Sequence, residues 1–290
     1  MAACALLLLL WLLPLWAQAE PLCATDDNNA QLCLNQPAER IIAFSPGATE
    51  LLFASGAGAQ LVAVVAYSDY PEQAKKLPVV GDTWGLNLEQ IMALRPDLMI
   101  AWPSGNGAGI LRRLKQLGLK VFALEPPRLE DIPAAITRLG QLTGHQDQAR
   151  QQAAELDRQI AKLRQQYSDQ RPVVTFYQLS EKPLMTVGGR QLINQAIRLC
   201  GGRNAFAALK PMAPQVGLES VLAANPEAII SSQPGDEWRN YWLKLPSLTA
   251  VQRNNLFYIP ADLIQRPTPR FLQGARLLCQ QLQQARAKVH

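Results

Sequence analysis

A stretch of 24 residues without glycine or proline, from His145 to Ser168, constrains the fold of this chain more than any other feature. It is rich in Ala, Gln, Leu, Arg and Lys, which all favour helices. Its apolar residues recur at alternating spacings of four and three, which places them on one face of a helix. They are Ala149, Ala153, Leu156, Ile160, Leu163 and Tyr167. A helix of this length would span roughly 36 Å, about the width of a small domain.

Gly144 lies just before this stretch and Pro172 just beyond it, and both are typical of helix ends. On each side, short apolar runs alternate with helical patterns. We therefore expect one long helix within residues 142–170, connecting an N-terminal α/β lobe at residues 39–141 to a C-terminal α/β lobe at residues 171–290. The alternative is an ordinary surface helix inside a single domain.

The two flanking segments each predict strands that alternate with helices. In the first we expect strands at residues 40–44, 61–66, 97–102 and 120–124, helices at 48–55, 87–94 and 110–117, and a glycine-containing loop at 104–109. In the second we expect strands at residues 172–177, 228–231 and 255–259, and helices at 190–199, 219–224 and 269–287. Such alternation is typical of parallel sheets covered by helices. The expected fold class is therefore α/β, with two lobes whose parallel central sheets are flanked by helices and bridged by one long α-helix.

The first 19 residues have the pattern of a signal peptide. Residues 6–15 are nearly all leucine, and Ala17-Gln18-Ala19 supplies the small residues of a cleavage site. This apolar run is too short to span a membrane. We therefore expect export and cleavage near Ala19, which leaves about 270 residues, enough for two lobes of ordinary size. Residues 20–38 are polar and rich in turn-forming residues, so we expect a loose leader there.

Four cysteines lie beyond the signal peptide, and an even number in an oxidising compartment predicts disulfides. Four cysteines allow three pairings. We favour Cys23–Cys33, which closes a short polar loop, and Cys200–Cys279, which ties an early helix of the second lobe to its last helix. A zinc site is disfavoured by the cysteine spacings and the scarcity of histidine. Lipid attachment at Cys23 is disfavoured because the three residues before it are not small.

The composition favours binding over catalysis. The net charge of +5 is spread along the chain, so nucleic acid is not indicated as a partner. The sequence has two histidines, His145 and His290, which leaves little from which to build a Ser-His-Asp triad or a histidine-rich metal site. The motifs G-x-S-x-G, G-x-x-x-x-G-K and G-x-G-x-x-G do not occur. We therefore expect no enzyme activity, no catalytic cofactor and no metal ligands.

Aromatic side chains gather where predicted strands end. Tyr67 and Tyr70 follow one strand, Trp84 lies in a turn, and Trp102 ends another strand. In open α/β sheets, ligands bind outside the carboxyl ends of the strands. Large rings at such edges suit a flat, partly apolar ligand, although any one of them can instead be partly buried packing.

Two charged residues follow the last predicted strand of the second lobe. Asp262 and Arg266 lie in the segment Ala261-Asp-Leu-Ile-Gln-Arg-Pro. If the carboxyl ends of both sheets face the same cleft, this pair can offer hydrogen bonds to amide or carboxylate groups of a ligand from the opposite side. We therefore count both as candidate ligand-binding residues.

Residues 86–100 and 216–230 repeat one pattern. Leu, Glu, a pair of apolar residues, Ala, Pro, an acid and a closing Ile recur in register. The repeat indicates two related lobes, each with one glutamate, Glu89 or Glu219, in the first turn of a helix. Neither has a basic residue three or four positions further along, so neither is placed for an ion pair within its helix. Acids are also favoured at helix starts by the helix dipole alone.

Several short motifs are more specific than these patterns. They are Ile41-Ile-x-Phe-Ser-Pro-x-x-Thr-Glu50, Tyr67-Ser-Asp-Tyr-Pro71, Asn87-Leu-Glu89, Pro96-Asp-Leu-Met-Ile-Ala-Trp102, Cys200-Gly-Gly, Pro214-Gln-Val and Pro269-Arg270. Together they resemble the periplasmic cobalamin-binding proteins of vitamin importers, a substrate-binding class with two lobes joined by a rigid helix. The resemblance runs from about Glu39 to Cys279, nearly the whole mature chain.

The resemblance implies that a corrinoid lies between the lobes. Its implied contacts are Tyr67, Trp84 and Trp102 on one side and Asp262 and Arg266 on the other. It further implies that Glu89 and Glu219 dock on arginines of two permease subunits, and it supports the Cys200–Cys279 disulfide.

Two aromatic positions of that family are changed in this chain. Met185 stands where the family has Phe, and Ala213 stands where it has Trp. We expect Met185 to take the place of the Phe in the ligand site. The prediction is a monomeric periplasmic protein that captures cobalamin and delivers it to an ABC importer. The alternatives are a haem- or ferric-siderophore-binding protein of the same fold, and an exported hydrolase.

Overall fold

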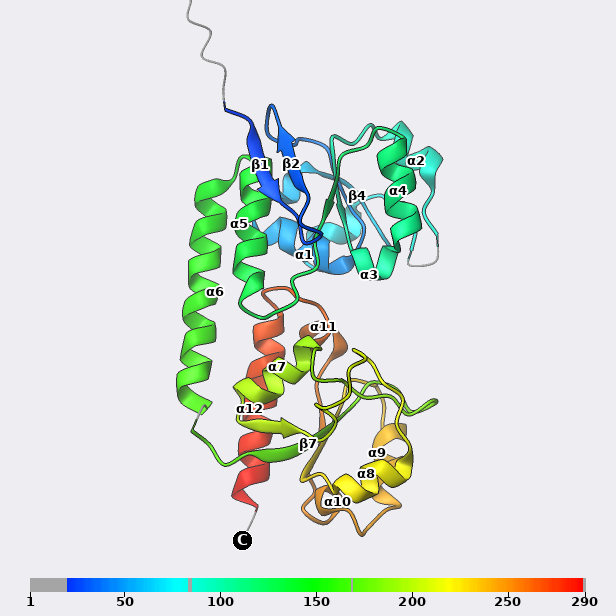
Figure 1. Cartoon of the computed structure of the whole chain (residues 1–290), viewed down its shortest axis with the longest axis vertical. Helices are drawn as coiled ribbons and strands as arrows, with labels where there is room; N and C mark the ends of the chain where they lie inside the picture. Colours follow the sequence, from blue (N-terminus) through cyan, green and yellow to red (C-terminus); the bar gives the residue numbers. More distant parts are fainter. Residues whose placement is uncertain (1–19, 83–84, 168, 289–290) are drawn as a thin grey trace, which may run out of the picture.

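The computed structural model describes residues 20–82, 85–167 and 169–288. Figure 1 shows two lobes, one above the other, with the long helix α6 (Gln146–Tyr167) running alongside both. Each lobe contains a four-stranded sheet in which all neighbouring strands are parallel. The predicted fold, two α/β lobes bridged by one long helix, is confirmed. The predicted signal peptide lies outside the described residues.

The sheet of the N-terminal lobe has the strand order β4-β3-β5-β6. Its strands are β3 (Ile41–Ala43), β4 (Leu61–Val64), β5 (Leu98–Ala101) and β6 (Val121–Ala123). Its helices are α1 (Pro46–Ala54), η1 (Ala57–Gln60), η2 (Glu72–Lys76), α2 (Leu88–Ala93), α3 (Pro103–Asn106), α4 (Ala108–Gln116) and α5 (Asp131–Thr143). Helix α1 begins where Ser45 Oγ accepts a hydrogen bond from the Ala48 N–H at 3.0 Å.

The sheet of the C-terminal lobe has the order β10-β9-β7-β8. Its strands are β7 (Val173–Gln178), β8 (Gly202–Asn204), β9 (Ala228–Ser231) and β10 (Leu256–Tyr258). Its helices are α7 (Leu192–Leu199), α8 (Leu218–Ala224), α9 (Glu237–Leu243), α10 (Thr249–Gln252), α11 (Ala261–Ile264) and α12 (Phe271–Ala287). Strand β8, at the edge of this sheet, and helices α9 and α10 lie where no element was predicted.

Each sheet is buried on both faces. Consecutive residues of a strand point to opposite sides of its sheet, so the contacts of neighbouring residues show what covers each face. In β3, Ile41 and Ala43 belong to a cluster of buried side chains that continues through α6 into the other lobe, whereas Ile42 packs on the opposite face. In β9, Ile230 joins the shared cluster and Ile229 packs on the opposite face. One continuous apolar core therefore connects the two lobes.

Helix α6 has the orientation that its apolar spacing predicts. Its buried residues are Ala149, Ala153, Leu156, Ile160, Leu163 and Tyr167. It packs along α5 in the first lobe and reaches α7 and α12 in the second. Twenty-two residues correspond to about 33 Å of helix, so one rigid element serves both lobes. No helix within the described residues is both long enough and apolar enough to cross a membrane.

The prediction of a loose leader at residues 20–38 is wrong. This segment forms an antiparallel hairpin of β1 (Leu22–Thr25) and β2 (Gln31–Leu34). Cys23 and Cys33 face each other across the hairpin and form one of the two predicted disulfides. Two strands alone are marginal in water, but this hairpin packs on α5, and Ala24 and Leu34 are buried in the shared core. The polar composition of this segment did not indicate a hairpin, because the hairpin is stabilised by a disulfide and by contacts with side chains of α5.

Short helices occupy the predicted loop at residues 104–109 and the segment after the last predicted strand. Residues 104–109 contain the end of α3 and the start of α4, separated by Gly107 with φ 78°. The segment with Asp262 contains the single-turn helix α11.

The second predicted disulfide, Cys200–Cys279, joins the end of α7 to α12.

Candidate functional site

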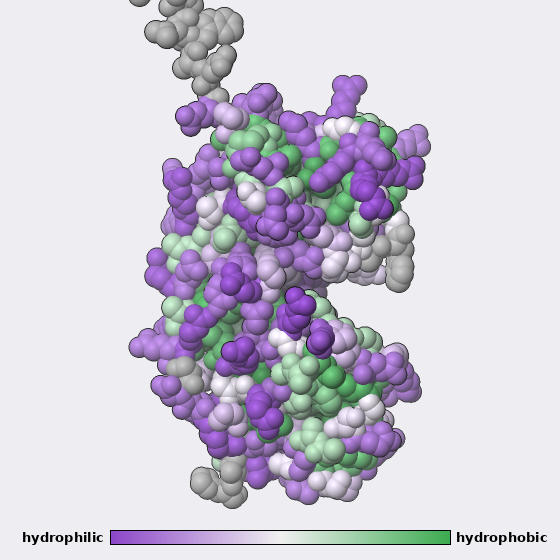
Figure 2. Space-filling model, viewed as in Figure 1, coloured by the Kyte–Doolittle hydropathy of each residue, from purple (hydrophilic) through white to green (hydrophobic). Residues whose placement is uncertain are grey.

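Figure 2 shows that the molecular surface is hollowed between the two lobes. The residues that follow β4, β5 and β10 come from both lobes, and the carboxyl ends of these strands are where ligands bind in open α/β sheets. The structure places Tyr67 after β4, Trp102 after β5, and Asp262 in α11 after β10. Trp84 lies outside the described residues.

The two described aromatic candidates of the first lobe are exposed to different degrees. The Tyr67 side chain is largely open, since the residue is 78% exposed, and its backbone has φ 65°. Trp102 is 37% exposed, and its indole N–H donates a hydrogen bond to Glu125 Oε1 at 3.0 Å. One ring is therefore free at the surface and the other is held in a defined orientation.

Arg266 brings the charged candidates together. Its guanidinium forms an ion pair with Asp262 Oδ1 at 2.7 Å, one helical turn earlier in the chain. It also reaches the first lobe, where it contacts Asp69 Oδ1 at 3.3 Å and the Tyr67 carbonyl oxygen at 3.5 Å. Asp262, Arg266 and Tyr67 are thus neighbours at the junction of the two lobes.

Glu50 has no role predicted from the sequence, although this residue lies at the centre of the same junction. Glu50 comes from α1 and is 3% exposed. Its Oε1 accepts from Arg266 at 3.0 Å and from Arg270 at 3.3 Å, and its Oε2 accepts from the Thr268 hydroxyl at 2.7 Å. We call Glu50, Arg266, Thr268 and Arg270 the inter-lobe cluster. The sequence signals for it were an acid within the apolar run of α1 and the place of Glu50 at the end of the motif that begins at Ile41.

Burial raises the pKa of Glu50 above its ordinary value of 4.5, and the hydrogen bonds from Thr268 and Arg266 only partly offset this effect. Two guanidinium groups nevertheless contact the carboxylate. Three residues of the segment Arg266–Arg270 therefore attach the second lobe to α1.

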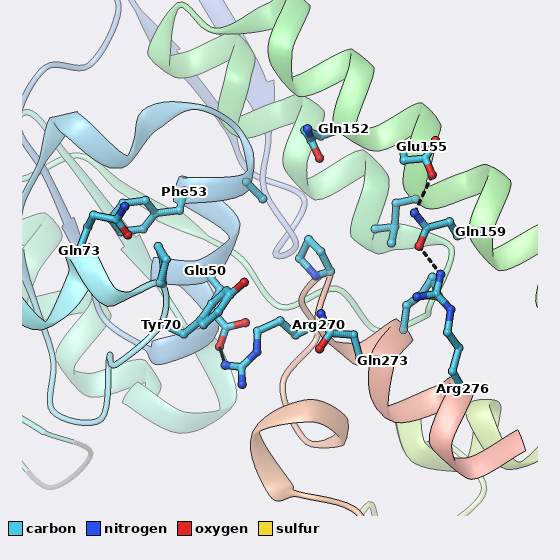
Figure 3. A pocket seen from close by; sticks show the side chains of 15 residues that line it. Glu50, Phe53, Tyr70, Gln73, Gln152, Glu155, Gln159, Arg270, Gln273 and Arg276 are labelled. Atoms are coloured by element: carbon cyan, nitrogen blue, oxygen red, sulfur yellow. Dashed lines mark hydrogen bonds and ion pairs between the residues drawn. The ribbon is translucent and has the colours of Figure 1, made fainter. Parts of the chain in front are cut away.

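A pocket of about 450 Å³ adjoins the inter-lobe cluster (Figure 3). It lies between α1, the Tyr70–Gln73 segment, α6 and the start of α12. Arg270 projects beside it, with its guanidinium 4.1 Å from the centre of the Tyr70 ring. None of the predicted ligand-binding residues Tyr67, Trp102, Met185, Asp262 and Arg266 lines this pocket. It is therefore distinct from the cleft that the sequence predicted.

Met185 and Ala213 are the two positions of the second lobe at which the resemblance calls for aromatic residues. Met185 is half-buried and forms isolated bridges with Ser180 and Gln215. Ala213, two residues before Gln215, is exposed. A small side chain therefore stands at an open position where the resemblance calls for a large ring.

Glu89 and Glu219 occupy matching places in the two lobes. Each lies in the first turn of a short helix, α2 or α8, that leads through a proline into a strand next to the first strand of its sheet. Both are exposed, and neither forms an ion pair among the described residues. This geometry agrees with the internal repeat, while the docking role remains a prediction.

A sequence model described as periplasmic binding protein matches residues 41–263, most of the chain and both lobes. The chain belongs to the periplasmic binding protein family. This family consists of binding proteins that are not enzymes, so the hydrolase alternative is set aside. The family also bears out the predicted class and the periplasmic location, while the cleavage site stays a prediction.

Relatives of this periplasmic binding protein align over almost their whole length. The vitamin B12-binding protein of Vibrio parahaemolyticus is 36% identical, covering 88% of this chain and 93% of the relative. The vitamin B12-binding protein of Yersinia pestis is 39% identical, covering 85% of this chain and 87% of the relative. The crystal structure of the periplasmic vitamin B12-binding protein BtuF of Vibrio cholerae superposes with a TM-score of 0.80 at 38% identity, covering 86% of this chain and 98% of that one.

Proposed function

We propose that this periplasmic binding protein captures cobalamin between its lobes and delivers it to an ABC importer. The observation that carries the proposal is the 36–39% identity to vitamin B12-binding proteins along nearly their whole length. The site supports it physically. A corrin macrocycle is broad and flat with carboxamide groups at its edge, so it needs aromatic surface together with charged hydrogen-bonding groups.

The proposed contacts divide between the lobes. Tyr67, Trp84 and Trp102 supply aromatic surface from the first lobe, and Met185 supplies a flexible apolar contact from the second. Asp262 accepts hydrogen bonds from amide N–H groups, and Arg266 donates to amide carbonyl oxygens. The ion pair between Asp262 and Arg266 fixes the orientation of both groups before the ligand arrives.

The test is incubation of purified protein with cobalamin, followed by gel filtration and an absorption spectrum of the protein peak. Corrin absorbance should elute with the protein, at the volume of a monomer. Haem binding is the alternative within the same fold, since a haem-binding protein superposes with a TM-score of 0.74 at 23% identity. Haem or a ferric siderophore eluting with the protein while cobalamin does not would refute the proposal.

We further propose that Glu89 and Glu219 dock on two equivalent basic patches of a dimeric permease. Charge pairs at such an interface steer encounter and fix orientation more than they add affinity. Glu89→Arg and Glu219→Arg should leave cobalamin titrations unchanged but reduce pull-down with the permease, and the double variant should lose more. Glu39→Arg is the matched control, because Glu39 is exposed and precedes β3, at the opposite end of the sheet. Normal docking of the double variant would exclude this role, and weak cobalamin binding would assign both residues to the cleft.

A further inference from the structure

Trp102 is held at its indole N–H, at its backbone N–H and by close packing of its ring on Gly105. Its N–H donates to Glu125 Oε1 at 3.0 Å, and its backbone N–H donates to Asn106 Oδ1 at 2.7 Å. The ring lies directly against Gly105, because a Cβ atom added there would fall 2.0 Å from ring atom Cε3. Only glycine leaves room for the ring at this place. Trp102 therefore has a fixed orientation although it is partly exposed.

Glu125 is the polar anchor of this arrangement. It follows β6, the strand next to β5, so its side chain lies beside the end of β5 where Trp102 stands. Besides the indole, its carboxylate accepts from the Ser104 hydroxyl at 2.5 Å and from the Ser104 N–H at 3.0 Å. No cation pairs with it among the described residues. The three donors to its carboxylate, the indole N–H and the two groups of Ser104, are all neutral.

The N-terminal hairpin holds the backbone at Glu125. The Glu125 N–H donates to Asp27 Oδ2 at 2.6 Å, and the Asp27 N–H donates to the Ala123 carbonyl oxygen at 2.9 Å. Asp26 Oδ2 accepts from the Ala123 N–H at 3.2 Å. The turn of the hairpin thereby occupies the free edge of β6 immediately before Glu125.

The hairpin is itself anchored at several points. Arg138 of α5 forms an ion pair with Asp27 at 2.7 Å and donates to the Thr25 carbonyl oxygen at 2.8 Å. Gln141 of the same helix donates to the Cys23 carbonyl oxygen at 2.7 Å. The Cys23–Cys33 disulfide closes the two strands behind this turn. A connected series of contacts therefore leads from the disulfide through Asp27 and Glu125 to the indole.

We propose that Glu125 is the positioning residue for Trp102, and that the disulfide-closed hairpin keeps Glu125 in place through Asp27. The ligand-binding part of this inference rests on the proposed function. Glu125 acts through the indole and does not contact the ligand. Fixing a side chain in its bound orientation saves the entropy that binding would otherwise cost, so loss of this anchor should weaken cobalamin binding by about 2- to 12-fold.

The test combines binding with a signal from the indole itself. Glu125→Ala should weaken cobalamin binding by this factor in calorimetric titrations. In proton–nitrogen NMR spectra without ligand, the Trp102 indole N–H resonance, assigned with Trp102→Phe, should move and exchange faster with water. Glu39→Ala is the matched control, because this exposed glutamate has no side-chain partner among the described residues. It should change neither quantity.

A double-mutant cycle separates positioning from a general effect on the fold. In a Trp102→Ala background, Glu125→Ala should cause no further loss of affinity. The Cys23→Ser/Cys33→Ser variant should show the same pattern with a smaller loss. Equal losses in both backgrounds, or an unchanged indole resonance, would overturn the proposal. If the wild-type chain does not bind cobalamin but the indole resonance still responds to Glu125→Ala, the proposed function fails while the positioning role stands.

Discussion

Removing the Glu50 carboxylate should weaken the attachment between the two lobes. In Glu50→Ala, Arg266 and Arg270 lose a shared acceptor, and the buried Thr268 hydroxyl loses the carboxylate oxygen to which it donates. Both arginine side chains are 17% exposed, so water replaces the lost contacts only in part. The variant therefore leaves charged and polar groups buried without adequate partners.

The size of the effect follows from what each group retains. Breaking a buried ion pair by removing one partner costs about 3–5 kcal/mol of unfolding free energy. Arg266 keeps Asp69 and Asp262, and Arg270 keeps the face of the Tyr70 ring, which favours the lower end of that range. We therefore expect a loss of about 3 kcal/mol, equivalent to a fall in Tm of about 6–12 °C. Glu50→Gln keeps the volume and one acceptor oxygen and should lose less.

Calorimetric melting of wild type, Glu50→Ala, Glu50→Gln and the control Glu39→Ala provides the assay. Exposed glutamates without partners contribute little, so Glu39→Ala should melt within about 0.5 kcal/mol of wild type. The predicted order of Tm is wild type, then Glu50→Gln, then Glu50→Ala. A Tm of Glu50→Ala equal to that of Glu39→Ala would show that the inter-lobe cluster does not stabilise the protein.

Three further outcomes are expected. Trp102→Ala should weaken cobalamin binding by at least the 0.5–1.5 kcal/mol that aromatic stacking adds to area burial, about 2- to 12-fold, in titrations of a variant whose circular dichroism is unchanged. Cys200→Ser/Cys279→Ser should lose about 4 kcal/mol in urea unfolding, because that disulfide closes a loop with a sequence separation of 79. The raised pKa of Glu50 means that the folded state favours its protonated form, so this residue adds stability as the pH falls through the folded pKa towards 4.5. In urea unfolding, the free energy of unfolding of wild type should therefore rise relative to that of Glu50→Gln as the pH falls over that interval. If the two free energies changed with pH in the same way, the assigned pKa direction would be contradicted.

The elements that could be predicted from the sequence are those whose pattern is local and long. The apolar face of α6 repeats over 22 residues, and all six residues predicted to lie on it are buried. The core strands are short, but each is an apolar run bounded by turn residues, which identifies a strand buried on both faces. Because strand–helix alternation restricts the connections, the parallel orientation of the predicted strands followed from these local patterns, whereas their order within each sheet was not predicted.

Helix α5 was not predicted, because it contains two residues that disfavour helices. Pro133 lies in its first turn, where a missing N–H costs little. Gly140 lies where α6 crosses, since a Cβ atom added there would fall 2.2 Å from the Ala149 Cβ. The same residue that weakens the helical pattern permits the close packing of α5 on α6. Such a reason becomes visible only when the second helix is in place.

The residues of the candidate site likewise include some that local sequence patterns predicted and one that they did not. Tyr67, Trp102, Asp262 and Arg266 could be named because each follows a predicted strand, and a parallel sheet brings the ends of its strands to one edge. Glu50 could not, because its partners lie more than 210 residues further along the chain and become neighbours only when the lobes meet. A carboxylate inside the apolar run of α1 nevertheless needs hydrogen-bonding or cationic partners or a raised pKa, since burial of an unpaired charge is prohibitive. A buried acid in one lobe of such a chain therefore indicates that partners exist, but the residues that supply them are identified only when the two lobes are placed together.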